Sequence, residues 1–180
     1  MKLCVNLGCG TYAKASTPNE EWVNVDLVQY PGVNIIHDLT VLPLPFDDNT
    51  CDEIILSHIL EHLPDYPSLM EDIYRICKKG AIIKISVPHL TSRNMWNDPT
   101  HIKFFIERTF HYFVDDGTIE HNPWQGRNWN FKLDKSKIIF GWWFMKPIEW
   151  VVNIFPDFYE NHLMFILQPT HIEVELEVLK

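Results

Sequence analysis

The first ninety residues contain five short apolar runs that are rich in valine and isoleucine and alternate little with polar residues. The runs are 3–7, 22–25, 33–36, 53–56 and 81–87. This pattern is typical of parallel β-strands that are buried on both faces. An amphipathic helix is predicted from Tyr66 to Lys79, with Gly80 as its stop. The order strand, helix, strand predicts a right-handed parallel crossover, so the sequence indicates an α/β fold.

Two connections between these runs leave little room for a helix. Only residues 27–32 join the second run to the third, and Pro43 and Pro45 lie between the third and the fourth. A parallel crossover needs about a dozen residues or more, and proline favours an extended loop. We therefore expect reduced helical cover between strands 2 and 4. The C-terminal half, or the second copy in a homodimer, would supply the missing cover.

After Pro88 the pattern changes. The sequence predicts a short helix around 107–114, a turn at 115–117, a strand or strand pair within 129–142, a helix within 155–167 and an alternating strand over 171–179. At 180 residues the chain is expected to form a single domain. Its two halves would be 1–88, which binds a cofactor, and 89–180, which shapes an acceptor site and completes the sheet.

The charge and the spacing of the cysteines limit the kinds of binding partner and the cellular compartment that we expect for this protein. The net charge is −9, and no long basic run offers counterion release to a nucleic acid. The sequence also contains a local basic cluster: Arg127, Lys132, Lys135 and Lys137. Two interpretations of it are open: it binds a small anionic partner, or it is a solvated face. The four cysteines form no C-x-x-C pair, which suits a reducing compartment. The N-terminus resembles no signal peptide, and no apolar stretch is free of charge and proline over a membrane-spanning length. We therefore expect a cytoplasmic protein without a membrane span.

The first run leads directly into a glycine-rich bend, Asn6-Leu7-Gly8-Cys9-Gly10. Glycines at such a bend let a ligand approach the backbone, and free N–H groups there could bind it. A short helix within 11–17 would follow. Asp26 and Asp38 stand at the ends of the second and third runs, where one carboxylate can accept from ribose hydroxyls and the other from an exocyclic amine.

Together these residues resemble the class I, Rossmann-like S-adenosylmethionine-dependent methyltransferases, particularly the small type-11-like group. The resemblance covers about residues 3–113. It rests on the glycine bend, Val25-Asp26-Leu27, His37-Asp38-Leu39 with the prolines after it, the segment from Cys51 to His62, and Asp98-Pro99-Thr100-His101. It implies a mixed seven-stranded sheet in the order 3-2-1-4-5-7-6 with the last strand antiparallel, and S-adenosyl-L-methionine as cofactor.

The resemblance also implies roles for individual residues. The expected cofactor contacts are Asn6, Leu7, Gly8, Cys9, Gly10, Asp26, Leu27, Asp38, Leu39 and Ser57. Imidazole titrates near neutral pH, so the candidates for a catalytic base are His58, His62 and His101. Trp96 and Asp98 would shape the acceptor site. We expect methyl transfer to a small-molecule acceptor in preference to a nucleic acid.

Three other interpretations are open to test. One is a non-catalytic module that binds S-adenosylmethionine or a nucleoside within a larger assembly. Another, a nicotinamide-dependent reductase, is disfavoured by the spacing from the glycine loop to Asp26 and by the Asp38 loop, whereas Ala13 in the place of a third glycine is tolerated in some Rossmann sites. The third is an H-x-x-E-H zinc site at 58–62, which needs one continuous helix. The apolar run up to Leu56 and the proline at Pro64 leave at most two turns, so we assign no metal ligands from the sequence.

Overall fold

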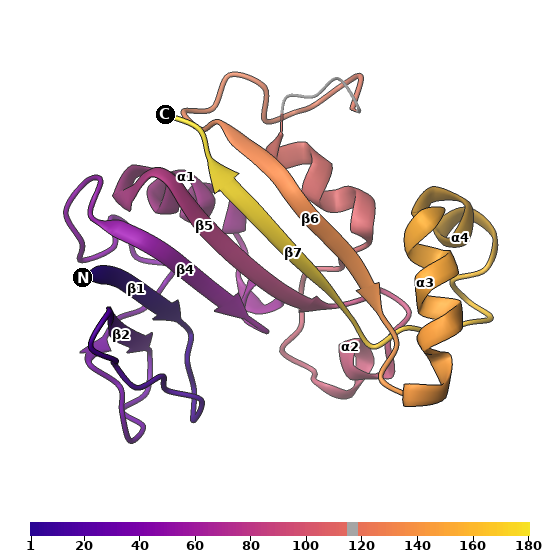
Figure 1. The fold of residues 1–180 in the computed structure, drawn as a ribbon, viewed down its shortest axis with the longest axis horizontal. Helices are drawn as coiled ribbons and strands as arrows, with labels where there is room; N and C mark the ends of the chain where they lie inside the picture. Colours follow the sequence, from indigo (N-terminus) through magenta and orange to yellow (C-terminus); the bar gives the residue numbers. More distant parts are fainter. Residues whose placement is uncertain (115–118) are drawn as a thin grey trace.

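The computed structural model describes residues 1–114 and 119–180, and within these ranges the chain forms a mixed seven-stranded sheet in the order β3-β2-β1-β4-β5-β7-β6 (Figure 1). The strands are β1 Lys2–Leu7, β2 Glu20–Asp26, β3 Ile35–Ile36, β4 Cys51–Ser57, β5 Cys77–Pro88, β6 Phe131–Ile139 and β7 His171–Val178. Strands β1 to β5 pair in parallel, and β7 runs antiparallel to both β5 and β6. The predicted order and the antiparallel last strand are confirmed.

The helices are short and lie mainly on one side of the sheet or beyond its end. The α-helices are α1 Tyr66–Ile76, α2 Arg93–Asn97, α3 Lys146–Ile154 and α4 Pro156–His162, and the 3₁₀ helices are η1 Leu60–His62, η2 Glu107–Phe113 and η3 Trp143–Met145. Helix α1 lies behind the sheet in Figure 1, and its buried side packs into the main core. Helices α3 and α4 lie beyond the edge strand β6, around a second small core. No helix in the described ranges is both long and apolar enough to cross a membrane.

One face of the sheet is open over β5 and β7, so the prediction of strands buried on both faces is wrong there, whereas β1 is buried on both faces from Cys4 to Leu7. In β5, Ile83 and Ile85 are buried whereas Lys84 between them is exposed. Lys84 Nζ lies 2.8 Å from Glu53 Oε1 on β4, and further ion pairs join β5 to β4 and β6 to β7. These pairs let the outer face stay in water without a covering layer. The reduced helical cover is confirmed, and the C-terminal half leaves this face uncovered (Figure 1).

Helix α1 ends earlier than predicted. It stops at Ile76, because Cys77 is already extended (φ −74°, ψ 146°) and pairs with Cys51 in β4. Gly80 therefore does not cap the helix. It lies inside β5 with φ +76°, where the pairing of β4 with β5 shifts register. The apolar spacing of the segment correctly predicts a helix, but the last residues of the predicted helix pair in a β-strand instead.

Two other segments differ from the sequence prediction, and one further prediction lies outside the described residues. Residues 11–17 form a loop, because Asn6 donates to the carbonyl of Tyr12 (3.1 Å) and Asn24 accepts from the amide of Lys14 (2.8 Å), which satisfies backbone groups without a helix. Helix α3 was not predicted, although Pro147 in its first turn is a helix-start signal. The turn expected at 115–117 lies outside the described residues.

The proline-rich segment between β3 and β4 is held by one arginine instead of a helix. Arg75 of α1 donates to the carbonyls of Leu44 (3.1 Å) and Phe46 (2.9 Å) and to the carboxylates of Asp48 (2.7 Å) and Asp72 (2.6 Å). Lysine cannot reproduce this planar set of donors. We expect Arg75→Lys to lower the free energy of unfolding by about 1–3 kcal/mol in a urea titration.

Arg93→Lys is the matched control, because Arg93 is exposed, and it should change the unfolding free energy by less than about 0.5 kcal/mol. Equal effects of the two substitutions would show that the segment does not depend on this arginine.

Candidate functional site

The glycine bend after β1 has a strained backbone that its packing requires. Gly8 and Gly10 have φ values of +66° and +51°. A Cβ on Gly8 would lie 2.6 Å from Cγ1 of Ile59, so no other residue fits there without movement. The N–H groups of the bend are already engaged: those of Gly8 and Cys9 donate to the carbonyl of Val25 (2.9 and 3.1 Å). The expectation of free N–H groups at these positions is therefore wrong.

Asp26 fixes the end of the bend from the neighbouring strand. Its Oδ2 accepts from the amide of Gly10 at 2.7 Å, and its Oδ1 accepts from the amide of Val28 at 2.9 Å. Each carboxylate oxygen can accept a further hydrogen bond. The acid predicted from the sequence thus lies directly against the glycine bend.

Asp38 stands at the same edge of the sheet. The amide of His37 donates to the carbonyl of Asp26 (3.0 Å), so the two acids follow paired strands. Asp38 Oδ1 accepts from the amide and the hydroxyl of Thr40 (2.9 and 2.7 Å), and these bonds hold the pKa of Asp38 below its usual value. The carboxylate is therefore ionised at neutral pH.

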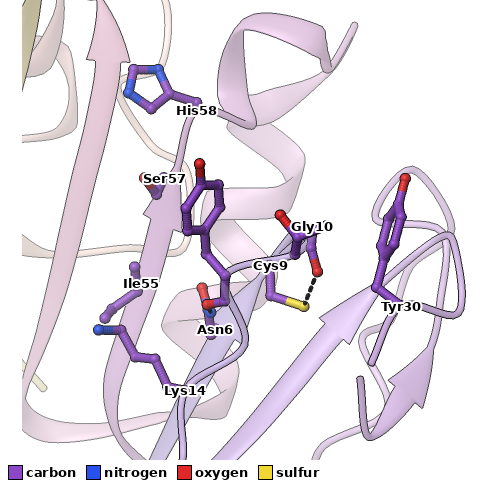
Figure 2. A pocket seen from close by; sticks show the side chains of 11 residues that line it. Asn6, Cys9, Gly10, Lys14, Tyr30, Ile55, Ser57 and His58 are labelled. Carbon is purple, nitrogen blue, oxygen red and sulfur yellow. Dashed lines mark hydrogen bonds between the residues drawn. The ribbon is translucent and has the colours of Figure 1, made fainter. Parts of the chain in front are cut away.

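A cavity of about 570 Å³ opens beside the bend (Figure 2). It is lined by Asn6, Gly8, Cys9, Gly10, Thr11, Tyr12, Lys14, Tyr30, Ile55, Ser57 and His58. In Figure 2, Tyr30 stands across the bend from Ser57 and His58. The volume is in the range of small-molecule and cofactor sites.

The cavity includes part of the predicted set. Six predicted residues line it: Asn6, Gly8, Cys9, Gly10, Ser57 and His58. Leu7 is buried in the core, and Leu27 is exposed in the connection after β2. Leu39 is also buried, with its side chain in the core. Asp26 and Asp38 lie at the same sheet edge, outside the described lining.

Sequence reasoning missed three large side chains of the lining: Tyr12, Lys14 and Tyr30. Tyr12 and Lys14 belong to the loop that was predicted to be a helix. Tyr30 belongs to the connection between β2 and β3, whose brevity was noted but whose aromatic residue was not used. An aromatic residue two positions after the bend is the signal that could have found Tyr12.

Cys9 is placed in the lining as a neutral thiol. Burial raises its pKa above the ordinary value, and the negative charge of Asp26 raises it further. Its Sγ donates to the carbonyl of Gly10 at 3.5 Å. Cys9 can therefore offer apolar contact and a weak donor, but it is no nucleophile at neutral pH.

Three histidines gather around a buried acid at the end of the cavity. Glu61 in η1 is fully buried. Its Oε1 lies 3.4 Å from Nδ1 of His58 and 3.9 Å from Nε2 of His101. The rings of His62 and His101 are 4.6 Å apart at their centroids. The three predicted catalytic candidates thus form one group, of which His58 lines the cavity.

The segment 58–62 does not form the continuous helix that an H-x-x-E-H zinc site needs. His58 has a φ of +53°, and only Leu60–His62 is helical, as one 3₁₀ turn. His58 and His62 therefore do not share a helix face. This agrees with the expectation drawn from Pro64.

Of the two predicted acceptor residues, Trp96 lies within α2 and Asp98 follows its C-terminal end. Trp96 is 65% exposed, donates to the carbonyl of Leu90 (3.1 Å) and packs on Phe104. Asp98 accepts from the hydroxyl of Thr100 (2.6 Å), which holds the pKa of Asp98 below its usual value. Its Oδ2 lies 3.9 Å from Nε2 of His101, so Asp98 borders the histidine group.

The basic cluster at 127–137 is paired with carboxylates. Arg127 contacts Glu71 at 3.1 Å, and Lys135 contacts Glu175 at 2.6 Å. Lys132 contacts Asp134 and Glu177, and Lys137 stands opposite Glu173 in the pairing of β6 with β7. The three lysines lie on β6 opposite glutamates of β7, and Arg127 pairs with α1, which weakens the case for an anionic partner there.

Comparison with known proteins agrees with this geometry. A family model described as "Methyltransferase domain" matches residues 6–120, more than half of the chain. The demethylmenaquinone methyltransferase of Lysinibacillus sphaericus (strain C3-41) is 32% identical over 54 residues, which are 30% of this chain and 23% of that protein. The chain thus aligns with less than a quarter of the length of the curated relatives it matches.

Solved structures show the same fold over almost the whole chain. A S-adenosylmethionine-dependent methyltransferase from Archaeoglobus fulgidus has a TM-score of 0.62 at 18% identity, covering 98% of this chain and 86% of that one. A Haloferax volcanii protein, solved in complex with the Trm112 methyltransferase activator, has a TM-score of 0.62 at 15% identity, with coverages of 99% and 83%. The chain therefore belongs to the methyltransferase domain family, the Rossmann-like enzymes that take S-adenosylmethionine as methyl donor.

Proposed function

We propose that this protein transfers the methyl group of S-adenosylmethionine to a small-molecule acceptor. The observation that carries the proposal is the cavity of about 570 Å³ beside the strained bend at Gly8, with Asp26 bound to that bend. Glycine bend, acid and cavity all lie at the carboxyl ends of neighbouring parallel strands, where α/β sheets bind their ligands.

The same geometry supports a place for each part of the donor. Gly8 and Gly10 would lie near the methionine portion, with Asn6, Cys9 and Ser57 along the cavity. Asp26 would accept hydrogen bonds from the ribose hydroxyls, and Asp38 would accept from the adenine amine. The backbone at Leu27 and Leu39, which follows these two acids, would border the nucleoside.

Methyl transfer from a sulfonium depends mainly on alignment and the exclusion of water. His58 lines the cavity, so we propose it as the base for an acceptor that must lose a proton. His62, His101 and Asp98 would lie on the acceptor side, with Trp96 at its outer border. The half 1–88 would then bind the donor, and 89–180 would shape the acceptor site and complete the sheet.

A small molecule is favoured over a nucleic acid for two reasons. The net charge is −9, and the basic cluster at 127–137 is paired with carboxylates. The curated relatives are named demethylmenaquinone methyltransferases, but the alignment covers less than a quarter of their length, so the acceptor's chemical identity is left to experiment. A homodimer and a cytoplasmic location stay predictions, the latter supported by four buried free cysteines.

Ligand-induced thermal stabilisation tests the donor assignment. S-adenosylmethionine and S-adenosylhomocysteine should each raise the melting temperature in a dose-dependent way, since a ligand at about 100 times its Kd stabilises by about 2.7 kcal/mol. NAD should have no effect. Stabilisation by NAD alone would contradict the proposal.

Transfer of labelled methyl separates an enzyme from a binding module. With metabolite and protein extracts as acceptors, the label should enter a small-molecule fraction in the presence of this protein. If the donor binds and no label moves in either extract, the module interpretation is favoured.

A further inference from the structure

Glu61, His62 and His101 form a group around a buried carboxylate that has no hydrogen-bond donor in the part of the chain that the structure describes. Glu61 is fully buried, and neither of its carboxylate oxygens has a hydrogen-bond partner among the described residues. A buried carboxylate that lacks donors is costly, because it has lost its hydration without replacement. Such a group indicates that a partner outside the protein chain completes the site.

The partner of His62 determines which of its ring nitrogens is free. The hydroxyl of Thr100 donates its single proton to Asp98 Oδ1 at 2.6 Å. The same hydroxyl lies 2.9 Å from Nδ1 of His62, so it must accept there, and Nδ1 carries the proton. In the neutral ring, Nε2 of His62 then has a free lone pair.

His101 is fixed in the same tautomer by a different partner. Its Nδ1 lies 2.9 Å from the carbonyl oxygen of Met95, which can only accept, so Nδ1 is again the protonated nitrogen. Its Nε2 lies 3.9 Å from Oε1 of Glu61. The lone pair of the second histidine is therefore on the nitrogen that is near the buried carboxylate.

Two backbone contacts hold the segments together. The amides of Ile102 and Lys103 donate to the carbonyl of Glu61 at 2.9 and 3.1 Å, which fixes the loop carrying His101 against η1. One ligand atom from each of Glu61, His62 and His101 lies within 4.8 Å of the others. Ligands at about 2.0–2.2 Å from one metal ion are roughly 3–3.5 Å apart, so a small rotation of the side chains would close the site.

From these contacts we infer that Glu61, His62 and His101 bind a divalent first-row transition-metal ion. Two imidazoles and one carboxylate suit zinc, iron, cobalt or manganese, whereas magnesium and calcium prefer oxygen ligands alone. Hydrogen bonds from the far nitrogens to Thr100 and Met95 are the outer contacts that metal-bound histidines make. Three protein ligands leave at least one position open on the ion.

The site differs from the H-x-x-E-H arrangement and from the donor cavity. His58 is not one of the three ligands, and His101 comes from a distant part of the sequence. The contact of 3.4 Å between His58 and Glu61 places the ion beside the donor cavity. Metal binding does not depend on the proposed methyl transfer, and the two are measured separately.

Cobalt binding to the full chain tests the inference. The protein is prepared without a histidine tag, treated with EDTA and titrated with Co²⁺ alone. We expect ligand-field absorption that saturates at one ion per chain, displacement by Zn²⁺, and a higher melting temperature with either ion. The absence of saturable absorption, together with no rise in melting temperature, would overturn the inference.

Variants show whether these residues hold the ion. Glu61→Gln and His101→Gln should each weaken Co²⁺ binding at least 100-fold, and Thr100→Val should weaken it about 10- to 100-fold because it frees Nδ1 of His62. His162→Gln, in an exposed histidine on α4, is the matched control and should bind normally. Unchanged Co²⁺ binding in Glu61→Gln or His101→Gln would contradict the assignment.

The metal-free stability of Glu61→Gln separates a metal site from a purely structural ion pair. Removing a buried charge without donors should leave the metal-free melting temperature equal or higher and abolish its rise with Zn²⁺. A structural pair between Glu61 and protonated histidines predicts the opposite, a lower melting temperature without metal and no response to metal in the native chain.

Discussion

Replacing Asp26 by alanine should weaken the binding of S-adenosylhomocysteine by about 100-fold or more. A hydrogen bond to a charged group contributes about 1.5–3 kcal/mol, and the proposed ribose contact involves two hydroxyls. Asp26 also accepts from the amides of Gly10 and Val28, so the variant should also loosen the bend that we propose as the donor site. Isothermal titration calorimetry with S-adenosylhomocysteine measures the effect.

The variant's fold must be checked alongside its affinity. Loss of the two carboxylate oxygens that accept from the amides of Gly10 and Val28 should lower the free energy of unfolding by about 1–3 kcal/mol. A urea titration will show whether the chain stays folded at the temperature of the binding experiment. Asp134→Ala removes the same charge on β6 and should leave affinity within twofold. An unchanged dissociation constant in a folded Asp26→Ala protein would contradict the ribose assignment.

Replacing Gly8 by alanine should destabilise the protein far more than the same change at Gly10. Both residues have positive φ, which costs an alanine about 1–2 kcal/mol. At Gly8 the new Cβ also meets Ile59 at 2.6 Å, whereas at Gly10 no described atom lies within 4 Å. Adding about 1–3 kcal/mol for overpacking gives a loss of about 2–5 kcal/mol for Gly8→Ala in urea unfolding.

A double-mutant cycle identifies the cause. Ile59→Ala removes Cγ1 and Cδ1, the two atoms that would lie nearest the new Cβ, so it should recover about 1–3 kcal/mol of the cost in the double variant Gly8→Ala/Ile59→Ala. Gly10→Ala combined with Ile59→Ala should show additive effects. If Gly8→Ala and Gly10→Ala cost the same, close packing against Ile59 does not govern this bend.

Local sequence patterns were sufficient to identify the individual parallel strands and the site elements that follow them. The Val- and Ile-rich strands that end at Leu7, Asp26 and Ser57 have their carboxyl ends at one edge of a parallel sheet. That is why the sequence alone placed the bend, Asp26 and His58 at the same edge of the sheet. The brevity of residues 27–32 likewise predicted the missing helix between β2 and β3.

Contacts between residues distant in the sequence determined the features that the local sequence pattern did not predict correctly. Pairing of Cys77 with Cys51 ended α1 early. One hydrogen bond donated by Asn6 and another accepted by Asn24 hold a loop that lines the cavity, where a helix was predicted. A single residue's preference for helix or loop is worth only about 1 kcal/mol, less than such tertiary contacts together.

The sequence by itself determined the strand framework, the glycine bend and the acids beside it, because these depend on residues close together in the chain. Only the tertiary structure decided that one face of the sheet stays open and that His101 reaches Glu61. The open face depends on ion pairs across four strands, and the metal site depends on two amides that bind the carbonyl of Glu61. Neither arrangement leaves a periodic signal along the chain, since each is formed by segments that meet only after folding.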